Sequence, residues 1–260
     1  CNEERLFNGC YTARVDRLIL SLAASAAVAL LLLLVLLPLY FVEAPPPGLP
    51  SALATTASLG GLAALLSLPM GLAAALATRR GGLWGAAMQA LYVPAVVPPT
   101  SVGVLLLASF SLPRALCAGG APAACPLSQI YDYFVNKPPG VLLAMFVMAL
   151  PTSFSIYDGA LKEERAEAYL RSLGFSGLSL LGALMSSLRR ATISALVFSW
   201  IRSFGELGTL LIFASYPVTT SIYIYNAWLI YGVGPAVGAS LAVMAAVLAT
   251  AYAVRTWLSR

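Results

Sequence analysis

The sequence predicts an all-α integral membrane protein, and three features carry the prediction. Of its 260 residues, 60% are hydrophobic and only 10% are charged, whereas a soluble domain has about 25% charged residues. Apolar runs of about 20 residues, the length that crosses a bilayer, recur along the chain. Arginine and lysine gather in short clusters between these runs, the pattern that sets membrane topology. We expect a single domain, residues 1–260, with about six membrane-spanning helices.

The predicted elements follow the order of apolar runs and turn residues. Prolines at 45–47 close the first span, and Arg79-Arg80-Gly81-Gly82 ends the second. The third contains Pro98 and Pro99, which membrane helices tolerate where neighbouring helices or a cavity satisfy the freed backbone groups. Spans are expected at 18–41, 53–77, 84–110, 141–157, 191–213 and 222–254, after a lead at 1–17, with loops at 111–138 and 158–190.

The basic residues predict the orientation. The proposed inner side holds Arg5, Arg14, Arg17, Arg79, Arg80, Lys162, Arg165, Arg171, Arg189, Arg190, Arg255 and Arg260. The outer side holds only Arg114 and Lys137, and Arg202 lies within a span. Because positive residues concentrate in cytoplasmic loops, both termini and the 158–190 loop are expected in the cytoplasm, in a multi-pass protein of the plasma membrane.

The 158–190 loop has the pattern of two helices joined by a capped turn. Glu167 precedes Arg171 by four residues, the favourable order for a helical ion pair. Gly174 suits the left-handed residue just past a helix end, with Phe175 folding back on Leu170. Apolar residues at helical spacing then predict an amphipathic helix that rests on the spans, at Leu178, Leu181, Leu184 or Met185, and Leu188. The pattern favours a docking element, and a solvated loop is the alternative.

Composition excludes several classes of function. The chain has no histidine, so a metal or haem site built on imidazole is excluded. The net charge of +5 lies in short clusters between spans, which does not indicate nucleic-acid binding. A phosphate-binding loop needs Gly-Lys-Ser/Thr, and the only lysines, Lys137 and Lys162, follow Asn136 and Leu161. We therefore expect no ATPase site and no cofactor in this chain.

Two cysteines lie in the loop that is expected outside the cell. Cys117 and Cys125 are eight positions apart, in a compartment where oxidation is permitted. We predict a disulfide between them, and free thiols at Cys1 and Cys10 on the cytoplasmic side. The alternative is that both loop cysteines are simply small apolar residues.

The sharpest chemical signal is a charged pair inside the fifth predicted span. Arg202 and Glu206 stand four residues apart, about the middle of that span, where ionised side chains are expensive and usually face a polar interior or pathway. Ser203 and Gly205 between them would allow another helix to approach closely. A purely structural ion pair between turns of one helix is the alternative.

Several of these segments resemble a known family. Residues 162–190 resemble the coupling loop of permease subunits of type I ABC importers, whose motif is Glu-Ala-Ala-x-x-x-Gly. Gly174 stands at the motif glycine and Ala168 at its glutamate, with Glu167 one position early. The run at 198–208, Phe-Ser-Trp-Ile-Arg-Ser-Phe-Gly-Glu-Leu-Gly, is similar to the Ala-Arg-Ser-hydrophobic-Gly-Glu-hydrophobic-Gly run in permeases for molybdate, tungstate and sulfate. Residues 92–100 and 214–220 are similar to the tungstate/molybdate branch in particular.

The resemblance implies a type I ABC importer permease that works as a homodimer by alternating access. Its implied partners are membrane lipid, two copies of a cytoplasmic ABC ATPase that bind ATP and Mg²⁺, and an extracytoplasmic protein that delivers tungstate or molybdate. Together with the residue patterns above, it assigns two sets of residues. ATPase coupling falls to Glu163, Glu164, Glu167, Ala168, Arg171, Leu173 and Gly174. The translocation path or gate falls to Arg202, Ser203 and Glu206.

Three alternatives stay open beside this interpretation. The nearest alternative substrate is sulfate, thiosulfate or another oxyanion. A secondary transporter would need ionisable coupling residues in several spans and often has repeated halves, whereas here one span has them. A membrane-embedded enzyme would need a histidine or an acidic cluster within the spans.

Overall fold

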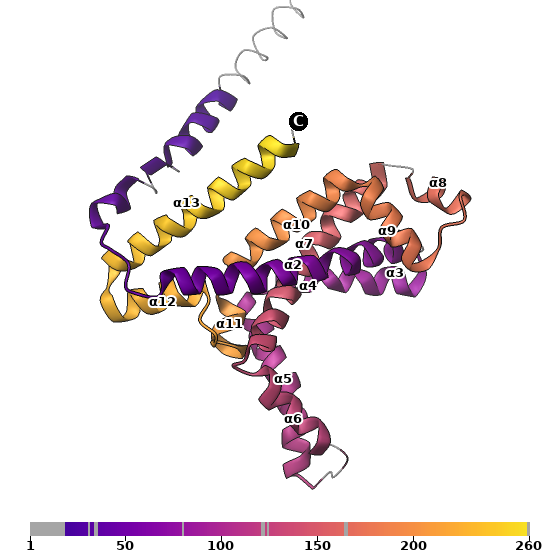
Figure 1. The fold of residues 1–260 in the computed structure, drawn as a ribbon, viewed down its shortest axis with the longest axis horizontal. Coiled ribbons are helices and arrows are strands. Elements are labelled where there is room, and N and C mark those ends of the chain that lie inside the picture. Colours follow the sequence, from indigo (N-terminus) through magenta and orange to yellow (C-terminus); the bar gives the residue numbers. More distant parts are fainter. Residues whose placement is uncertain are drawn as a thin grey trace, which may run out of the picture.

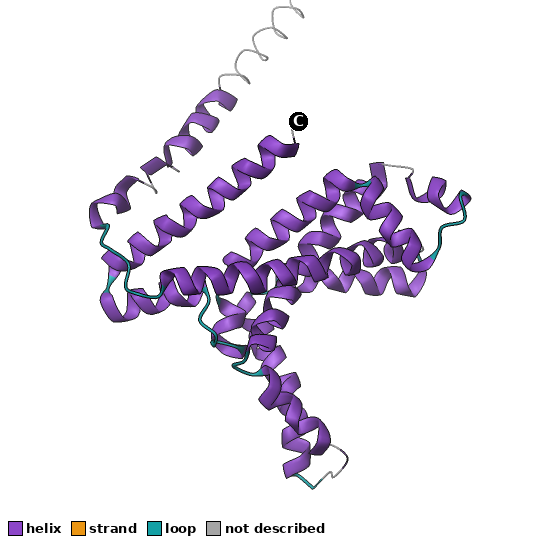
Figure 2. Ribbon diagram, in the orientation of Figure 1, coloured by secondary structure: helices purple, strands orange, loops and turns teal. Residues whose placement is uncertain are grey.

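The computed structural model describes residues 19–30, 32–33, 36–79, 81–120, 123, 125–163 and 166–258. Every regular element in these ranges is a helix (Figure 2), which confirms the predicted all-α class. The predicted lead at 1–17, with Cys1 and Cys10, lies outside the described residues.

The helices follow one another closely along the chain. After the helix Ile19–Leu30 and a 3-10 turn at Leu37–Phe41, they are α2 (Leu49–Arg79), α3 (Gly82–Met88), the 3-10 turn Gln89–Tyr92, α4 (Val93–Val96), α5 (Pro99–Ala118), α6 (Cys125–Phe134), α7 (Pro138–Glu163), α8 (Ala166–Ser172), α9 (Gly177–Ser187), α10 (Arg189–Phe204), α11 (Gly208–Phe213), α12 (Thr220–Tyr231) and α13 (Val233–Leu258).

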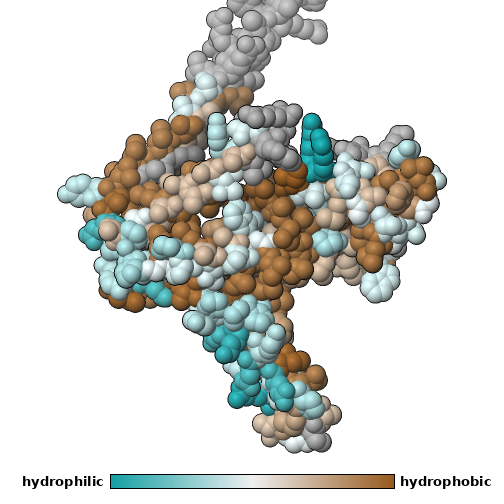
Figure 3. Space-filling model, viewed as in Figure 1, coloured by the Kyte–Doolittle hydropathy of each residue, from teal (hydrophilic) through white to brown (hydrophobic). Residues whose placement is uncertain are grey.

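Among the described helices, α2, α5, α7 and α13 are long and apolar enough to cross a membrane. The pair α9 and α10, which meet at 90°, makes a fifth if it counts as one span. The predicted count of six is therefore not confirmed. Much of the surface seen in Figure 3 is apolar, as expected for helices that face lipid or other helices, and hydrophilic residues gather on the α5–α6 hairpin.

The centre of the fold is the packing of α7 and α10 against α2. Small residues allow this packing, because a Cβ added to Gly60 would lie 2.9 Å from Cβ of Ser203, and one added to Gly71 would lie 2.8 Å from the backbone nitrogen of Phe154. Close approach through small residues is the usual way in which membrane helices gain contact area. The buried side chains between these helices and α9 include Leu72, Phe154, Tyr157, Leu161 and Leu184.

The predicted third span, 84–110, is divided in the structure. α4 ends at Val96, Val97 has an extended backbone with ψ 143°, and α5 starts at Pro99. The residue before a proline disfavours the helical conformation, and here both Val97 and Pro98 precede one. The two consecutive prolines, Pro98 and Pro99, are therefore the local cause of the break.

The fifth and sixth predicted spans are divided as well. The span at 191–213 becomes α10 and α11, with a break after Phe204. The span at 222–254 becomes α12 and α13, which meet at Gly232 with a positive φ of 93°. A residue without a Cβ adopts this conformation readily, so the chain turns back there instead of continuing in one helix.

The predicted loop at 111–138 is largely helical. α5 continues to Ala118, and α6 returns alongside it, so the two form an arm that projects from the bundle (Figure 1). Arg114 on α5 lies 3.5 Å from the Asp132 carboxylate and over the ring of Tyr131 on α6. Ring contacts of Phe110 with Phe134 and with Phe213 join the base of the arm to the bundle.

Candidate functional site

Arg202 and Glu206 lie together, but not on one helix. Arg202 is in the last turn of α10, whereas Glu206 lies in the break between α10 and α11. Nη1 of Arg202 donates a hydrogen bond of 3.2 Å to Oε2 of Glu206. The two residues pair as their spacing predicted. The expected continuous helix over 191–213 is wrong, because Gly205 ends α10 between them.

The second oxygen of Glu206 holds the start of the next helix. Oε1 accepts a hydrogen bond of 2.9 Å from the backbone N–H of Thr209 in the first turn of α11. The side chain of Glu206 is fully buried, and that of Arg202 is 35% exposed. A buried carboxylate is stable only when paired and hydrogen-bonded, and both conditions are met here. Thr209 is a residue that the sequence analysis missed, because its role depends on the break.

The start of α11 also packs closely on the start of α5. Oγ1 of Thr209 donates to the carbonyl of Pro99 at 2.9 Å. A Cβ added to Gly208 would lie 2.9 Å from the backbone nitrogen of Thr100. The two broken helices, α4–α5 and α10–α11, therefore meet at their breaks, and Glu206 is buried beside this junction.

The two small residues between the charges have different surroundings. Ser203 is buried against Gly60 of α2 and donates through Oγ to the Ser199 carbonyl at 3.1 Å. Gly205 is exposed, and the nearest atom to a Cβ added there is the Arg202 carbonyl at 3.8 Å. Close helix approach therefore occurs at Ser203 and not at Gly205.

The turn after α8 has the cap that the sequence predicts. Gly174 has a φ of 89°, its N–H donates to the Arg171 carbonyl at 3.0 Å, and the Phe175 N–H donates to the Leu170 carbonyl at 3.2 Å. These two bonds define a Schellman cap, in which a left-handed residue ends the helix. Leu173 precedes the glycine and is exposed.

The acidic residues of the segment are only partly described. Glu163 ends α7, which continues beyond the predicted end of the fourth span at 157, and Glu164 lies outside the described residues. Glu167 accepts from Arg171 at 3.0 Å, as its spacing predicted, and Ala168 is exposed.

Arg79, which the sequence analysis used only for topology, connects three helices at this end of the bundle. Its guanidinium donates to the Leu161 carbonyl of α7 and lies 3.8 Å from Oε2 of Glu167 on α8. The last residue of α2 thus holds the end of α7 and the start of the 158–190 loop. The sequence shows that residue 79 is basic, but it does not show that Arg79 contacts Leu161 and Glu167.

The helix α9 turns most of the predicted face to the bundle. Leu184 and Leu188 are buried, and Leu181 and Met185 pack against the core. The prediction is wrong at Leu178, which is 86% exposed, whereas Leu180 is buried. The segment then bends by 90° into α10. Across this bend, the Tyr157 hydroxyl donates to Oγ1 of Thr192, which donates to the Met185 carbonyl, each at 3.0 Å.

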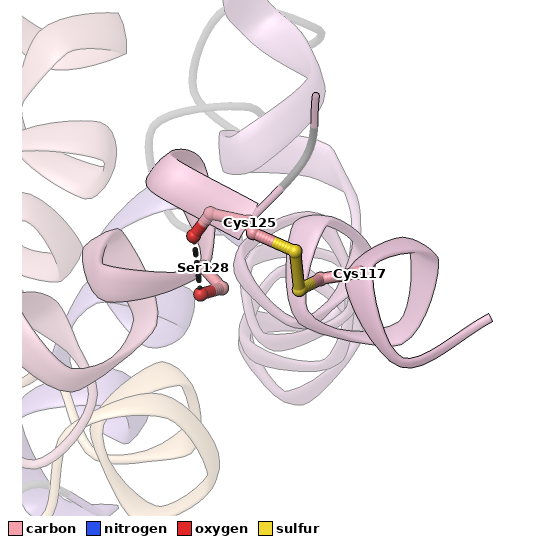
Figure 4. Close-up of a disulfide and its surroundings, with 3 residues drawn as sticks. All are labelled: Cys117, Cys125 and Ser128. Carbon is pink, nitrogen blue, oxygen red and sulfur yellow. Dashed lines mark hydrogen bonds between the residues drawn. A yellow bond between two sulfur atoms is a disulfide. The ribbon is translucent and has the colours of Figure 1, made fainter. Parts of the chain in front are cut away.

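Cys117 and Cys125 form a disulfide at the tip of the arm, joining the end of α5 to the start of α6 (Figure 4). The Ser128 hydroxyl donates to the Cys125 carbonyl at 2.7 Å and so supports the first turn of α6. The structure therefore contains the bond that the spacing of these cysteines predicted.

The predicted site residues form two separate groups. α8 and the following turn lie at one end of the bundle, whereas α11, which directly follows Arg202, Ser203 and Glu206 in the chain, lies near the base of the arm (Figure 1). The packed helices α2, α7 and α10 run between the two groups. These features define a multi-pass membrane protein with a charged helix break in its bundle and an exposed helical segment at one end.

Comparisons with known proteins agree with this class. No protein-family model matches the chain. The molybdate/tungstate transport system permease protein WtpB of Thermococcus kodakarensis is 29% identical over 197 residues, which are 74% of this chain and 69% of that protein. Proteins of the same name from Pyrococcus furiosus and Pyrococcus abyssi are each 28% identical, over 69% and 71% of this chain and 64% and 66% of their own lengths. The chain is therefore similar to permeases named for molybdate/tungstate transport, the family that its motifs resemble.

Proposed function

We propose that this chain is the membrane-spanning subunit of an ATP-driven importer for tungstate or molybdate. It forms the translocation path, and a separate cytoplasmic ATPase drives it. The single observation that carries the proposal is the similarity to three permeases named for molybdate/tungstate transport. Two features of the structure support it, one for coupling and one for the path.

The feature that supports coupling is an exposed apolar cluster on the 158–190 segment. Tyr169 and Leu178 are 65% and 86% exposed, and Leu173 and Phe175 are exposed beside them. Exposed large apolar side chains at a rigid, capped turn are typical of surfaces that another protein covers. The proposed occupant is a groove of the ATPase, which would receive α8 and its turn.

Motion of the docked segment would reach the spans through identified contacts. Arg79 links α8 to the ends of α2 and α7, and the Tyr157–Thr192–Met185 hydrogen bonds link the α9–α10 bend to α7. In the proposed mechanism, closure of the ATPases on ATP moves the segment. The packed helices then transmit this movement to the charged break at Arg202 and Glu206.

The feature that supports an anion path is the partly exposed guanidinium of Arg202. A doubly charged oxyanion in an apolar bilayer needs a counter-charge or fixed donors to replace part of its lost water. Glu206 neutralises much of the Arg202 charge, which suits a transient contact and not a trap. The complete assembly contains two copies of this chain, two ATPases and an extracytoplasmic binding protein, with the α8 end in the cytoplasm.

Competition between oxyanions tests the substrate. The chain is reconstituted in proteoliposomes with the ATPase and binding protein of the same cell, and uptake of radioactive tungstate is measured with unlabelled molybdate or sulfate in excess. Suppression by molybdate and not by sulfate supports the proposal. Suppression by sulfate at equal concentration would instead assign the chain to sulfate or general oxyanion transport.

A further inference from the structure

A groove of about 450 Å³ lies between two pairs of elements. The 3-10 turn Gln89–Tyr92 and α4 form one side, and α7 and α10 form the other. The residues that line it include Tyr92, Pro151, Thr152, Ser155, Ser194 and Phe198. Thr152 and Ser155 lie near the middle of α7, one of the helices long and apolar enough to span a membrane. A hydroxyl-bearing groove therefore sits well inside the membrane-spanning part of the chain.

The hydroxyls in this groove differ from most others in the spans. Serine and threonine in a helix commonly bond to a carbonyl one turn back, as Thr56, Ser67 and Ser203 do in this protein. By contrast, the side-chain hydroxyls of Thr152, Ser155 and Ser194 form no hydrogen bond with any described residue. Among the described residues, the fully buried side-chain oxygen without a hydrogen bond is Oγ1 of Thr219, so the three groove hydroxyls are not fully buried. Three residues with unbonded hydroxyls thus line one groove.

Unpaired hydroxyls at this depth need a partner. A polar group left without a hydrogen bond in hydrocarbon is unfavourable, so a groove that faced only lipid would favour hydroxyls folded back on their own helices. Unbonded donors are instead what a hydrated path or a polar ligand requires. No acidic side chain lines the groove, so nothing on its described walls repels an anion.

The helix α10 also carries a basic residue, Arg202, whose charge is paired with Glu206. Ser194, Phe198 and Arg202 follow one another at four-residue spacing, so they share one face of α10. Arg202 therefore lies about 12 Å along the helix from Ser194, at a rise of about 1.5 Å per residue. Phe198, which is 58% exposed, stands between them. An anion that met Arg202 first would pass this ring before it reached the hydroxyls.

We propose that Thr152, Ser155 and Ser194 form a transit site that binds a tetrahedral oxyanion by hydroxyl donors alone, with Phe198 separating it from Arg202. The proposal rests on the proposed function, and it names the residues that touch the substrate. A site with donors and no full charge takes over part of the hydration shell and still releases the ion. Each hydroxyl can turn its hydrogen toward the ligand, because it has no other described acceptor.

Cysteine labelling tests the site in the full chain. Ser155→Cys and Ser194→Cys are placed singly in a background with Cys1→Ser and Cys10→Ser, with the Cys117–Cys125 disulfide kept. The matched control is Leu105→Cys, an exposed position on α5 outside the groove. Each variant is embedded in lipid nanodiscs and treated with a negatively charged methanethiosulfonate, with and without tungstate.

We expect both groove cysteines to react at least about tenfold faster than the control, because only a hydrated thiol forms the reactive thiolate. Tungstate should slow both reactions severalfold, whereas chloride of equal ionic strength should not. Two results would overturn the proposal. One is a lack of reaction at both groove positions, which would mean that lipid or a second copy fills the groove. The other is reaction that tungstate does not slow.

Uptake measured in parallel separates this proposal from the proposed function. The triple variant Thr152→Val, Ser155→Ala, Ser194→Ala removes the hydroxyls at nearly constant volume, and it should lose most tungstate uptake while it still assembles in the membrane. Wild-type uptake in the triple variant refutes the site and leaves the proposed function standing. Absence of oxyanion uptake by the unsubstituted chain refutes the proposed function, and the labelling result then decides whether the groove binds tungstate.

Discussion

Oε2 of Glu206 lies 3.2 Å from Nη1 of Arg202, across the point where α10 ends. The carboxylate is fully buried and the guanidinium is partly exposed, so the two members of the pair are not equivalent. Because Glu206 also accepts from the Thr209 N–H, one carboxylate joins the end of α10 to the start of α11.

This asymmetry predicts the order of stability among variants of the pair. Arg202→Met leaves a buried carboxylate without its counter-charge, a change that typically costs about 3–5 kcal/mol. Glu206→Gln keeps an acceptor for Thr209 and leaves Arg202 able to reach water, so its effect should be smaller. The double variant should be more stable than Arg202→Met alone. Thermal unfolding in detergent and folded yield give the ranking.

The same variants show whether the pair also serves transport. We expect oxyanion uptake to fall in the double variant even where folded yield recovers, because Arg202 is the charge beside the proposed path. If all three variants assemble and transport like wild type, the pair is neither a gate nor a structural support.

The cap at Gly174 should be needed for coupling and not for folding. Gly174→Val places a Cβ at a φ of 89°, although nothing lies within 4 Å of it, so the strain is conformational, at about 1–2 kcal/mol. We expect the variant to reach the membrane normally but to couple ATP hydrolysis to transport poorly. Gly182→Val in α9 is the matched control, because that position is equally open and has no positive φ. Tight coupling in the Gly174 variant would contradict the assignment.

Arg79 should hold the 158–190 segment in place. Its ion pair with Glu167 is long and partly exposed, so it contributes little. The charged hydrogen bond to the Leu161 carbonyl is worth about 1.5–3 kcal/mol. Arg79→Met should therefore speed hydrogen exchange across α8 by about tenfold or more. Arg114→Met, which removes an exposed pair on the arm, is the control, and equal effects of both variants would refute the role.

The disulfide predicts a specific count of reactive thiols. Iodoacetamide should label only Cys1 and Cys10 in the unreduced, denatured chain, and all four cysteines after reduction. Removing the bond by Cys117→Ser should loosen the tip of the arm, because a closed loop of this length restrains the open state by about 2–3 kcal/mol in the loop-entropy model. Four labels without reduction would show that the pair is not oxidised in the cell.

Features with local causes could be predicted from the sequence. The cap at Gly174, the Glu167–Arg171 pair and the Cys117–Cys125 bond each depend on residues within a few positions of one another, and the structure contains all three. The Pro98-Pro99 pair likewise held the cause of the α4–α5 break. There the long apolar run predicted one continuous span, but the two prolines end the helix within it.

Features with tertiary causes could not be predicted. The α10–α11 break is fixed by the Glu206 carboxylate on Thr209 and by the packing of Gly208 on Thr100, which lies far away in the sequence. The buried face of α9 includes Leu180 in place of Leu178. Several leucines in that helix fit a helical spacing, and contact with the neighbouring helices determines which of them are buried. The groove hydroxyls gave no signal, since serine and threonine are common in membrane helices and most bond to their own backbone.

The most direct test of the central claim is ATP dependence of tungstate uptake. Proteoliposomes hold this chain with its ATPase, and ATP is supplied on the side of the α8 turn, with the binding protein and radioactive tungstate on the other side. We predict uptake against a gradient with ATP, none with a non-hydrolysable analogue, and no effect of ionophores that collapse proton and sodium gradients. Uptake that persists without ATP hydrolysis and stops with those ionophores would show a secondary transporter and contradict the account.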